Sequence, residues 1–133
     1  MKKISATLFV LVVILALAGT ASAQSTLKAN IPFDFTVGDK HLEKGEYIVR
    51  LDSSVVQLSH VVKGSGAMSL VHAATPEQQR QDALVFRRCG DAIFLWKILR
   101  ADGTPRELVQ TRSEIEIAKK YQGSPRIETA AAK

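Results

Sequence analysis

Two histidines have a spacing that could build a metal or catalytic centre. His60 and His72 flank a turn at residues 64–66, so a hairpin there would set them diagonally across two paired strands. Two imidazoles on one face of a sheet can hold a metal ion if a third ligand joins them. The chain has no HxH, HExxH or CxxC motif to supply that ligand. We therefore expect two partly exposed strand histidines and no metal or cofactor. A small-ligand or hydrolytic site at His60 and His72 is kept as the alternative.

A second candidate is the acidic cluster of Asp34, Asp39, Glu43 and Glu46. Two carboxylates that flank a cleft can hydrolyse a glycosidic bond. Period-two alternation directs Asp34 and Glu46 away from the apolar face of their strands. We interpret them as solvated charges that discourage edge-to-edge aggregation, and assign no catalytic residue. The Asp34 and Glu46 pair remains part of the hydrolytic alternative.

The run from Gly64 to Gly66 has neither the spacing of a nucleophile elbow nor that of a phosphate-binding loop. A hairpin turn is the use that fits it. Arg87 is predicted to lie opposite Phe94 in a later hairpin, where a cation–π contact could form. This basic and aromatic pair is either a patch for an acidic polymer or cross-strand packing, and we favour packing.

The single cysteine, Cys89, excludes an internal disulfide. At the tip of a hairpin it would be either half-buried or a free thiol. In an oxidising compartment, a free thiol could join two copies into a dimer.

Alternating apolar residues predict the strands that would position these side chains. The opening strand carries Ile31, Phe33, Phe35 and Val37 on one face. The expected strands cover residues 29–37, 46–51, 55–62, 67–73, 83–88, 92–99 and 107–110, with a mobile polar loop at 74–82.

The Gly90-Asp91 link predicts a tight hairpin in which Cys89 pairs with Ala92. Phe86 would then face Leu95, and Val85 would face Trp96. The second arm would direct Ile93 and Leu95 to one face and Phe94, Trp96 and Ile98 to the other, as in a central strand.

A helix is predicted over residues 114–122. Ser113 fits an N-cap with Glu116 three residues later, Ile115 and Ala118 would dock, and Gly123 would end the helix. The fold class is thus all-β: a small antiparallel sandwich or partly closed barrel of six to seven strands with one C-terminal helix. Residues 24–123 would form a single domain and residues 124–133 a flexible tail.

Residues 1–23 predict a secretory signal peptide: Lys2 and Lys3, an apolar run at 8–18, then Ala21-Ser22-Ala23. Cleavage would leave a periplasmic or secreted protein that meets the membrane only through this peptide. The net charge of +5 comes from interspersed charges, so we expect no nucleic-acid partner.

The segments IPFDFTVGDKHLEKGEY, FRRCGDAIFLWKI and SEIEIAKK resemble an uncharacterised family of small secreted bacterial proteins with an IPFxFxVG…LxxGxY opening. Glu43-Lys44 departs from the small pair expected at the turn. The resemblance implies no activity or site residues. We expect a non-enzymatic binding or structural module of the cell envelope, with a protein or polysaccharide partner.

Overall fold

The computed structural model describes residues 25–76, 81–101, 103–121 and 123–133 and is an all-β sandwich with a C-terminal helix. The strands run in chain order as β1 (Ser25–Ile31), β2 (Phe35–Val37), β3 (Lys40–Leu42), β4 (Gly45–Leu51), β5 (Val55–His60), β6 (Gly66–Ala73), β7 (Ala83–Cys89), β8 (Ala92–Leu99), β9 (Arg106–Leu108) and β10 (Arg126–Ala131). The helix α2 (Arg112–Lys120) lies between β9 and β10. Residues 1–24, where the signal peptide is predicted, and residues 77–80 of the loop lie outside the described residues.

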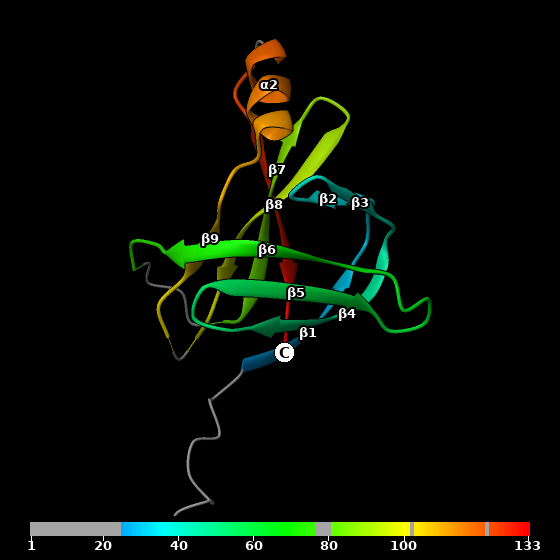
Figure 1. Ribbon diagram of the computed structural model, residues 1–133, viewed down its shortest axis with the longest axis vertical. Coiled ribbons are helices and arrows are strands. Elements are labelled where there is room, and N and C mark those ends of the chain that lie inside the picture. The colour runs from blue at the N-terminus through cyan, green and yellow to red at the C-terminus, as the bar shows by residue number, and fades with distance from the viewer. Residues whose placement is uncertain (1–24, 77–80, 102, 122) are drawn as a thin grey trace, which may run out of the picture.

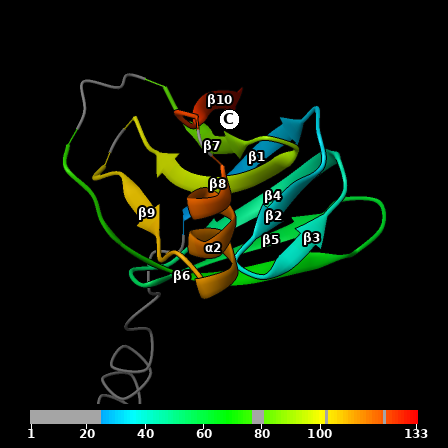
Figure 2. The same ribbon diagram turned by 90° about the horizontal axis from the view of Figure 1, so that it is seen from above.

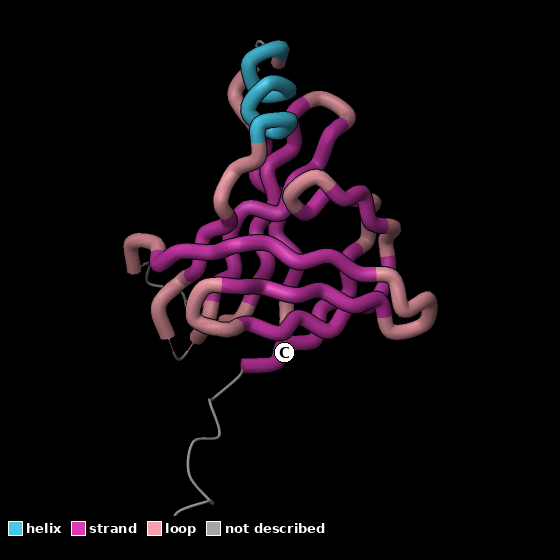
Figure 3. Tube along the Cα trace, viewed as in Figure 1, coloured by secondary structure: helices cyan, strands magenta, loops and turns pink. Residues whose placement is uncertain are grey.

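The strands form one mixed, unclosed sheet that folds into two layers (Figure 1, Figure 3). The order β1-β4-β5-β6-β9-β8-β2-β3 follows antiparallel neighbours except where β2 pairs in parallel with β8, and β7 joins β8 to β10. Strand β6 belongs to both layers, because it pairs with β5 along most of its length and with β9 at its end. In the part of the chain that the structure describes, no helix is long and apolar enough to span a membrane.

The predicted opening strand is divided in two. Strand β1 ends at Ile31 and pairs with β4, whereas β2 starts at Phe35 and pairs with β8 and β3. Pro32 follows β1 directly and has no N–H to offer a sheet ladder, so the chain leaves one layer there and enters the other. The apolar alternation survives the break because Ile31 and Phe35 are both buried.

The core lies between the two layers and contains the residues that the alternation predicted. Tyr47, Val49 and Leu51 are buried, and Phe35 stacks edge-on against Tyr47, with ring centroids 5.3 Å apart. The rings of Phe35 and Phe33 also make edge contacts with Phe86, at 5.4 Å and 4.9 Å. Phe33, however, is only partly buried.

The β7–β8 hairpin forms as predicted near its turn, where Cys89 pairs with Ala92 and Phe86 with Leu95. The register then shifts, and Val85 pairs with Lys97 instead of Trp96. Trp96 is therefore the extra residue of a β-bulge, which reverses the faces beyond it. Ile98 consequently joins Ile93 and Leu95 in the main core, contrary to the prediction, while Trp96 packs in a second cluster made of Ala83, Val85 and Leu99.

Helix α2 begins earlier than the sequence predicted. Thr111 is the N-cap and its hydroxyl oxygen accepts a hydrogen bond from the Glu114 N–H, so Ser113 lies inside the first turn. Glu114 is the buried residue of the helix, whereas Ile115 and Ala118, which we expected to dock, are both exposed. The helix has its C-cap at Tyr121, before Gly123.

We expect Thr111→Ala to lower the free energy of unfolding by about 1 kcal/mol, the usual cost of a lost N-cap. Ser113→Ala is the matched control, because the Ser113 side chain is exposed and does not cap the helix. Urea denaturation of both variants measures the difference. Equal losses for the two would contradict the assignment of Thr111.

The C-terminal segment is a strand in place of the expected flexible tail. Strand β10 pairs along its whole length with β7, and Ala132 bridges to Ala29 of β1. Figure 2 shows β10 beside β7 at the edge of the layer. Its burial pattern explains the error: Ala130 is the only buried side chain of this strand, so the segment is held by backbone pairing more than by apolar contacts.

Candidate functional site

The two histidines of the predicted pair lie at opposite ends of the β5–β6 hairpin. His60 ends β5 beside the turn and is buried, whereas His72 is exposed near the far end of β6, opposite Glu107 of β9, so neither is partly exposed as predicted. Among the described residues, no group of three or more His, Cys, Asp or Glu could hold a metal ion. The arrangement therefore does not unite His60 and His72 in one site.

His60 instead organises the turn that follows it. Its Nδ1 accepts hydrogen bonds from the backbone N–H groups of Val62 and Lys63, both at 3.1 Å. The ring packs edge-on against Tyr47 and lies over Gly45, where a Cβ would overlap Nε2. Because Nδ1 accepts two bonds, the ring proton belongs on Nε2. These contacts indicate that His60 is a structural residue of the turn.

The acidic pair is also divided between separate contacts. Asp34 accepts a hydrogen bond from the Lys44 N–H at 2.9 Å, and Glu46 forms an ion pair with Lys28 at 3.1 Å. Both side chains are exposed. Of the four pockets described, one is lined by Glu46 and none by Asp34, His60 or His72.

Arg87 pairs with Phe94 in the register, as predicted, but its cation–π partner is Trp96. The guanidinium lies 4.0 Å from the Trp96 ring centre, and the Lys97 ammonium lies 4.1 Å from it. The indole N–H donates to Glu107 at 2.9 Å. These contacts lock Trp96 into cross-strand packing, the interpretation that we favoured over a patch for an acidic polymer.

Cys89 is buried, and this burial raises the pKa of its thiol. A dimer through Cys89 would require that the thiol first be exposed. Burial in the first turn of α2 likewise raises the pKa of Glu114, against the opposing effects of Arg87 and of a hydrogen bond from the Thr111 backbone.

The raised pKa of Glu114 predicts a stability that falls as pH rises. The folded state binds this proton more tightly than the unfolded state, so the stabilisation is complete below the unfolded value of about 4.5 and is lost above it. As pH rises from 4 to 7, the free energy of unfolding of wild type should therefore fall relative to that of Glu114→Gln, as measured by urea denaturation. Glu116→Gln, on an exposed position of the same helix, should show no such difference.

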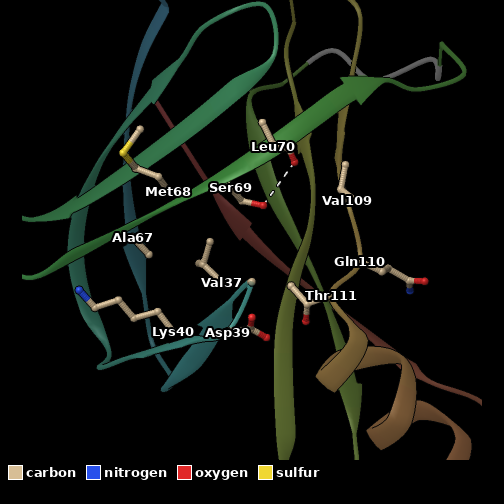
Figure 4. A pocket seen from close by; sticks show the side chains of 11 residues that line it. Val37, Asp39, Lys40, Ala67, Met68, Ser69, Leu70, Val109, Gln110 and Thr111 are labelled. Atoms are coloured by element: carbon tan, nitrogen blue, oxygen red, sulfur yellow. Dashed lines mark hydrogen bonds between the residues drawn. The ribbon is translucent and has the colours of Figure 1, made fainter.

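A groove beside β6 is the site that sequence reasoning missed. Its pocket has a volume of about 530 Å³ and lies between β6, the turn joining β2 to β3, and the segment leading from β9 into α2. Figure 4 shows Met68, Ser69 and Leu70 of β6, with Val37 to Lys40 on one side and Val109 to Thr111 on the other. A second pocket shares Lys40, Ala67 and Met68, so the groove continues along β6 towards Gly66.

The side chains of β6 alternate between the floor and the rim of this groove. Ala67 is buried, whereas Met68 and Leu70 are 64% and 61% exposed. Val109 adds a further apolar side chain that is 46% exposed. These three form an exposed apolar rim, a feature that often marks an interaction site when its residues are contiguous.

The backbone of β6 also has an unpaired edge in the groove. The Val71 N–H and the Ser65 C=O bond towards β5, whereas the Leu70 C=O accepts from Val109 on the other side. By the alternation of an antiparallel strand, the N–H and C=O groups of Gly66 and Met68 face the groove. In the described residues, β9 pairs with β6 only over residues 71–73, so no strand pairs with this edge at 66–69, although β2 and β3 approach β6 within 8 Å between Cα atoms.

One signal in the sequence could have pointed to the groove: the stretch 66–70, Gly-Ala-Met-Ser-Leu, has no charge. Open edge strands ordinarily carry charges or are covered. Which edge is open depends, however, on the strand order, and that order is not readable from the alternation.

The chain was compared with protein-family models, curated proteins and solved structures, and none of them matches it.

Proposed function

We propose that this chain is an exported, non-enzymatic binding module of the cell envelope, periplasmic or secreted. The groove beside β6 carries the proposal. It combines an apolar rim of Met68, Leu70 and Val109 with unpaired backbone groups, which is a composition suited to holding a partner. The partner is a protein or polysaccharide of the envelope.

The alternative is a small-ligand or hydrolytic site. It would need two of His60, His72, Asp34 and Glu46 to converge in a pocket. The positions of these residues give it less support, since His60 is engaged by the turn and Glu46 by Lys28. The binding-module interpretation instead assigns the partner to the groove beside β6.

Export is tested by the mass of the mature protein. We expect the intact mass of protein recovered from outside the inner membrane to begin at Gln24, allowing for cyclisation of its amino group. The order of basic residues, apolar run and Ala21-Ser22-Ala23 is the reason. A recovered chain that retains Met1 would overturn the export part of the proposal.

Binding is tested by capture of envelope proteins and polysaccharides on immobilised mature protein. Leu70→Asp puts a charge on the rim of the groove, and Ile127→Asp puts the same charge on β10, at a position 51% exposed. We expect partners that are retained by wild type and Ile127→Asp but lost with Leu70→Asp. Identical retention by all three proteins would exclude the groove as the binding surface.

A further inference from the structure

We propose that the occupant of the groove is an extended polypeptide segment that adds to β6 as a strand. This inference rests on the proposed binding function and names its partner class. The hydrogen-bonding groups of Gly66 and Met68 face the groove in an alternating pattern that only another extended backbone matches. Addition of a strand to an open sheet edge is a recurring mode of peptide recognition.

The surroundings of this edge favour a single chain over a second folded copy. On one side stand Gly38 and Asp39 of the β2–β3 turn, and on the other stand Gln110 and Thr111. The sheet edge of another folded domain carries its neighbouring strand with it, and these walls would obstruct that strand. A lone extended segment brings no neighbouring strand with it and extends the sheet by only about 4.8 Å.

The lack of charge distinguishes this edge from the edge strand β3. Strand β3 carries Lys40 and His41, which discourage association, whereas residues 66–70 of β6 carry no charge at all. The β6 edge lacks protecting charges and is recessed in a groove. A single extended segment can therefore reach it, whereas the edge of another sheet cannot.

The lining predicts the sequence pattern of the segment. Residues directed outwards would lie beside Met68 and Leu70 and should be apolar, while those directed inwards would meet Val37 and Ala67 and should be small. Lys40 lines both pockets of the groove, and among the described residues it forms no ion pair. An acidic residue is therefore expected at the end of the segment beside Gly66.

The first experiment selects displayed random ten-residue peptides on the mature protein, residues 24–133, and on Lys40→Glu. We expect alternating apolar and small residues on wild type, with an acidic residue at one end that is replaced by a basic residue on Lys40→Glu. Selection of no peptide, or of peptides without alternation, would overturn the proposal.

The second experiment tests the backbone bonds with the best selected peptide. N-methylation should weaken binding about tenfold at every second position and little at the positions between, because only alternate N–H groups meet β6. Hydrogen exchange of the Met68 amide should slow on binding, whereas the amide of Ser69, already directed to β5, should change little. Uniform effects along the peptide would exclude strand addition.

A matched pair of variants gives the same test from the protein side. Met68→Pro removes the N–H that faces the groove, a change tolerated at an open edge, and Met68→Ala removes only the side chain. We expect Met68→Pro to bind the peptide about tenfold more weakly than Met68→Ala, with hydrogen exchange confirming that both are folded. Equal affinities would refute the backbone contact.

The two proposals fail in different ways. If Leu70→Asp abolishes capture of an envelope partner but no peptide shows the alternating pattern, the binding module stands and the strand-like occupant does not. If the immobilised protein captures only a polysaccharide, the binding module likewise stands and the strand-like occupant does not. If neither capture nor peptide binding depends on the groove, both proposals fall.

Discussion

Phe35→Ala is expected to lower the free energy of unfolding by about 3–5 kcal/mol, through lost transfer energy and the cavity left behind. Phe35 is 1% exposed, and its ring contacts both Tyr47 and Phe86. It thus joins β2 to strands of both layers. Since a domain of this size has a total stability of only about 5–15 kcal/mol, the unfolding midpoint in urea should fall sharply.

Phe33 and Asp34 provide graded comparisons within the same segment. Phe33→Ala should cost less than Phe35→Ala, because Phe33 is only partly buried although it contacts Phe86. Asp34→Asn should be nearly silent, since the exposed amide retains an oxygen that can accept from the Lys44 N–H. An Asp34→Asn loss as large as that of Phe35→Ala would contradict the burial of Phe35 in the core and would favour a functional role for Asp34.

Gly45→Ala is expected to be comparably damaging, for a different reason. Gly45 has φ of +146°, a conformation that side-chain-bearing residues rarely adopt, and a Cβ there would overlap the His60 imidazole. Backbone strain of about 1–3 kcal/mol adds to a similar cost for displacing the ring. Displacement would also disturb the bonds from the Val62 and Lys63 N–H groups to His60.

The two contributions can be separated by denaturation of three further variants. Gly64 also has a positive φ, of +68°, but a Cβ there would meet nothing within 4 Å, so Gly64→Ala reports strain alone at about 1–2 kcal/mol. In a double-mutant cycle, His60→Ala should relieve part of the cost of Gly45→Ala. Strict additivity of the two changes would mean that the ring does not constrain Gly45.

The sequence predicted best those elements whose two faces differ in polarity. Strand β4 starts one residue from its predicted bound, and the β7–β8 turn has the predicted pairing of Cys89 with Ala92. The prediction for the second half of β8 was wrong because consecutive apolar residues stand before Trp96 and again after Lys97, so the alternation does not reveal where an extra residue enters. The position of the bulge in β8 follows instead from the contacts that the Trp96 ring makes with Arg87 of β7 and Glu107 beside it on β9.

The predicted start of the helix was wrong because two overlapping sequence patterns fit the N-cap rule. Thr111 precedes Glu114 by three residues, just as Ser113 precedes Glu116. The first pattern forms because Glu114 can be buried in the first turn while the Thr111 oxygen receives its N–H. The candidate histidine pair failed in a similar way: flanking a turn does not place two residues level across the strands, and His72 lies too far along β6.

The bridge between Ala29 and Ala132 has a consequence for when this domain can fold. It connects β1 to a residue about a hundred positions later, so the sandwich cannot be completed until the chain has been made as far as Ala132. Contacts between such distant residues make folding slow, on the scale of milliseconds to seconds for β-rich domains. A chain emerging from the ribosome would therefore stay unfolded for longer than one built from local contacts. An unfolded chain is the form that can be threaded through a narrow translocation channel.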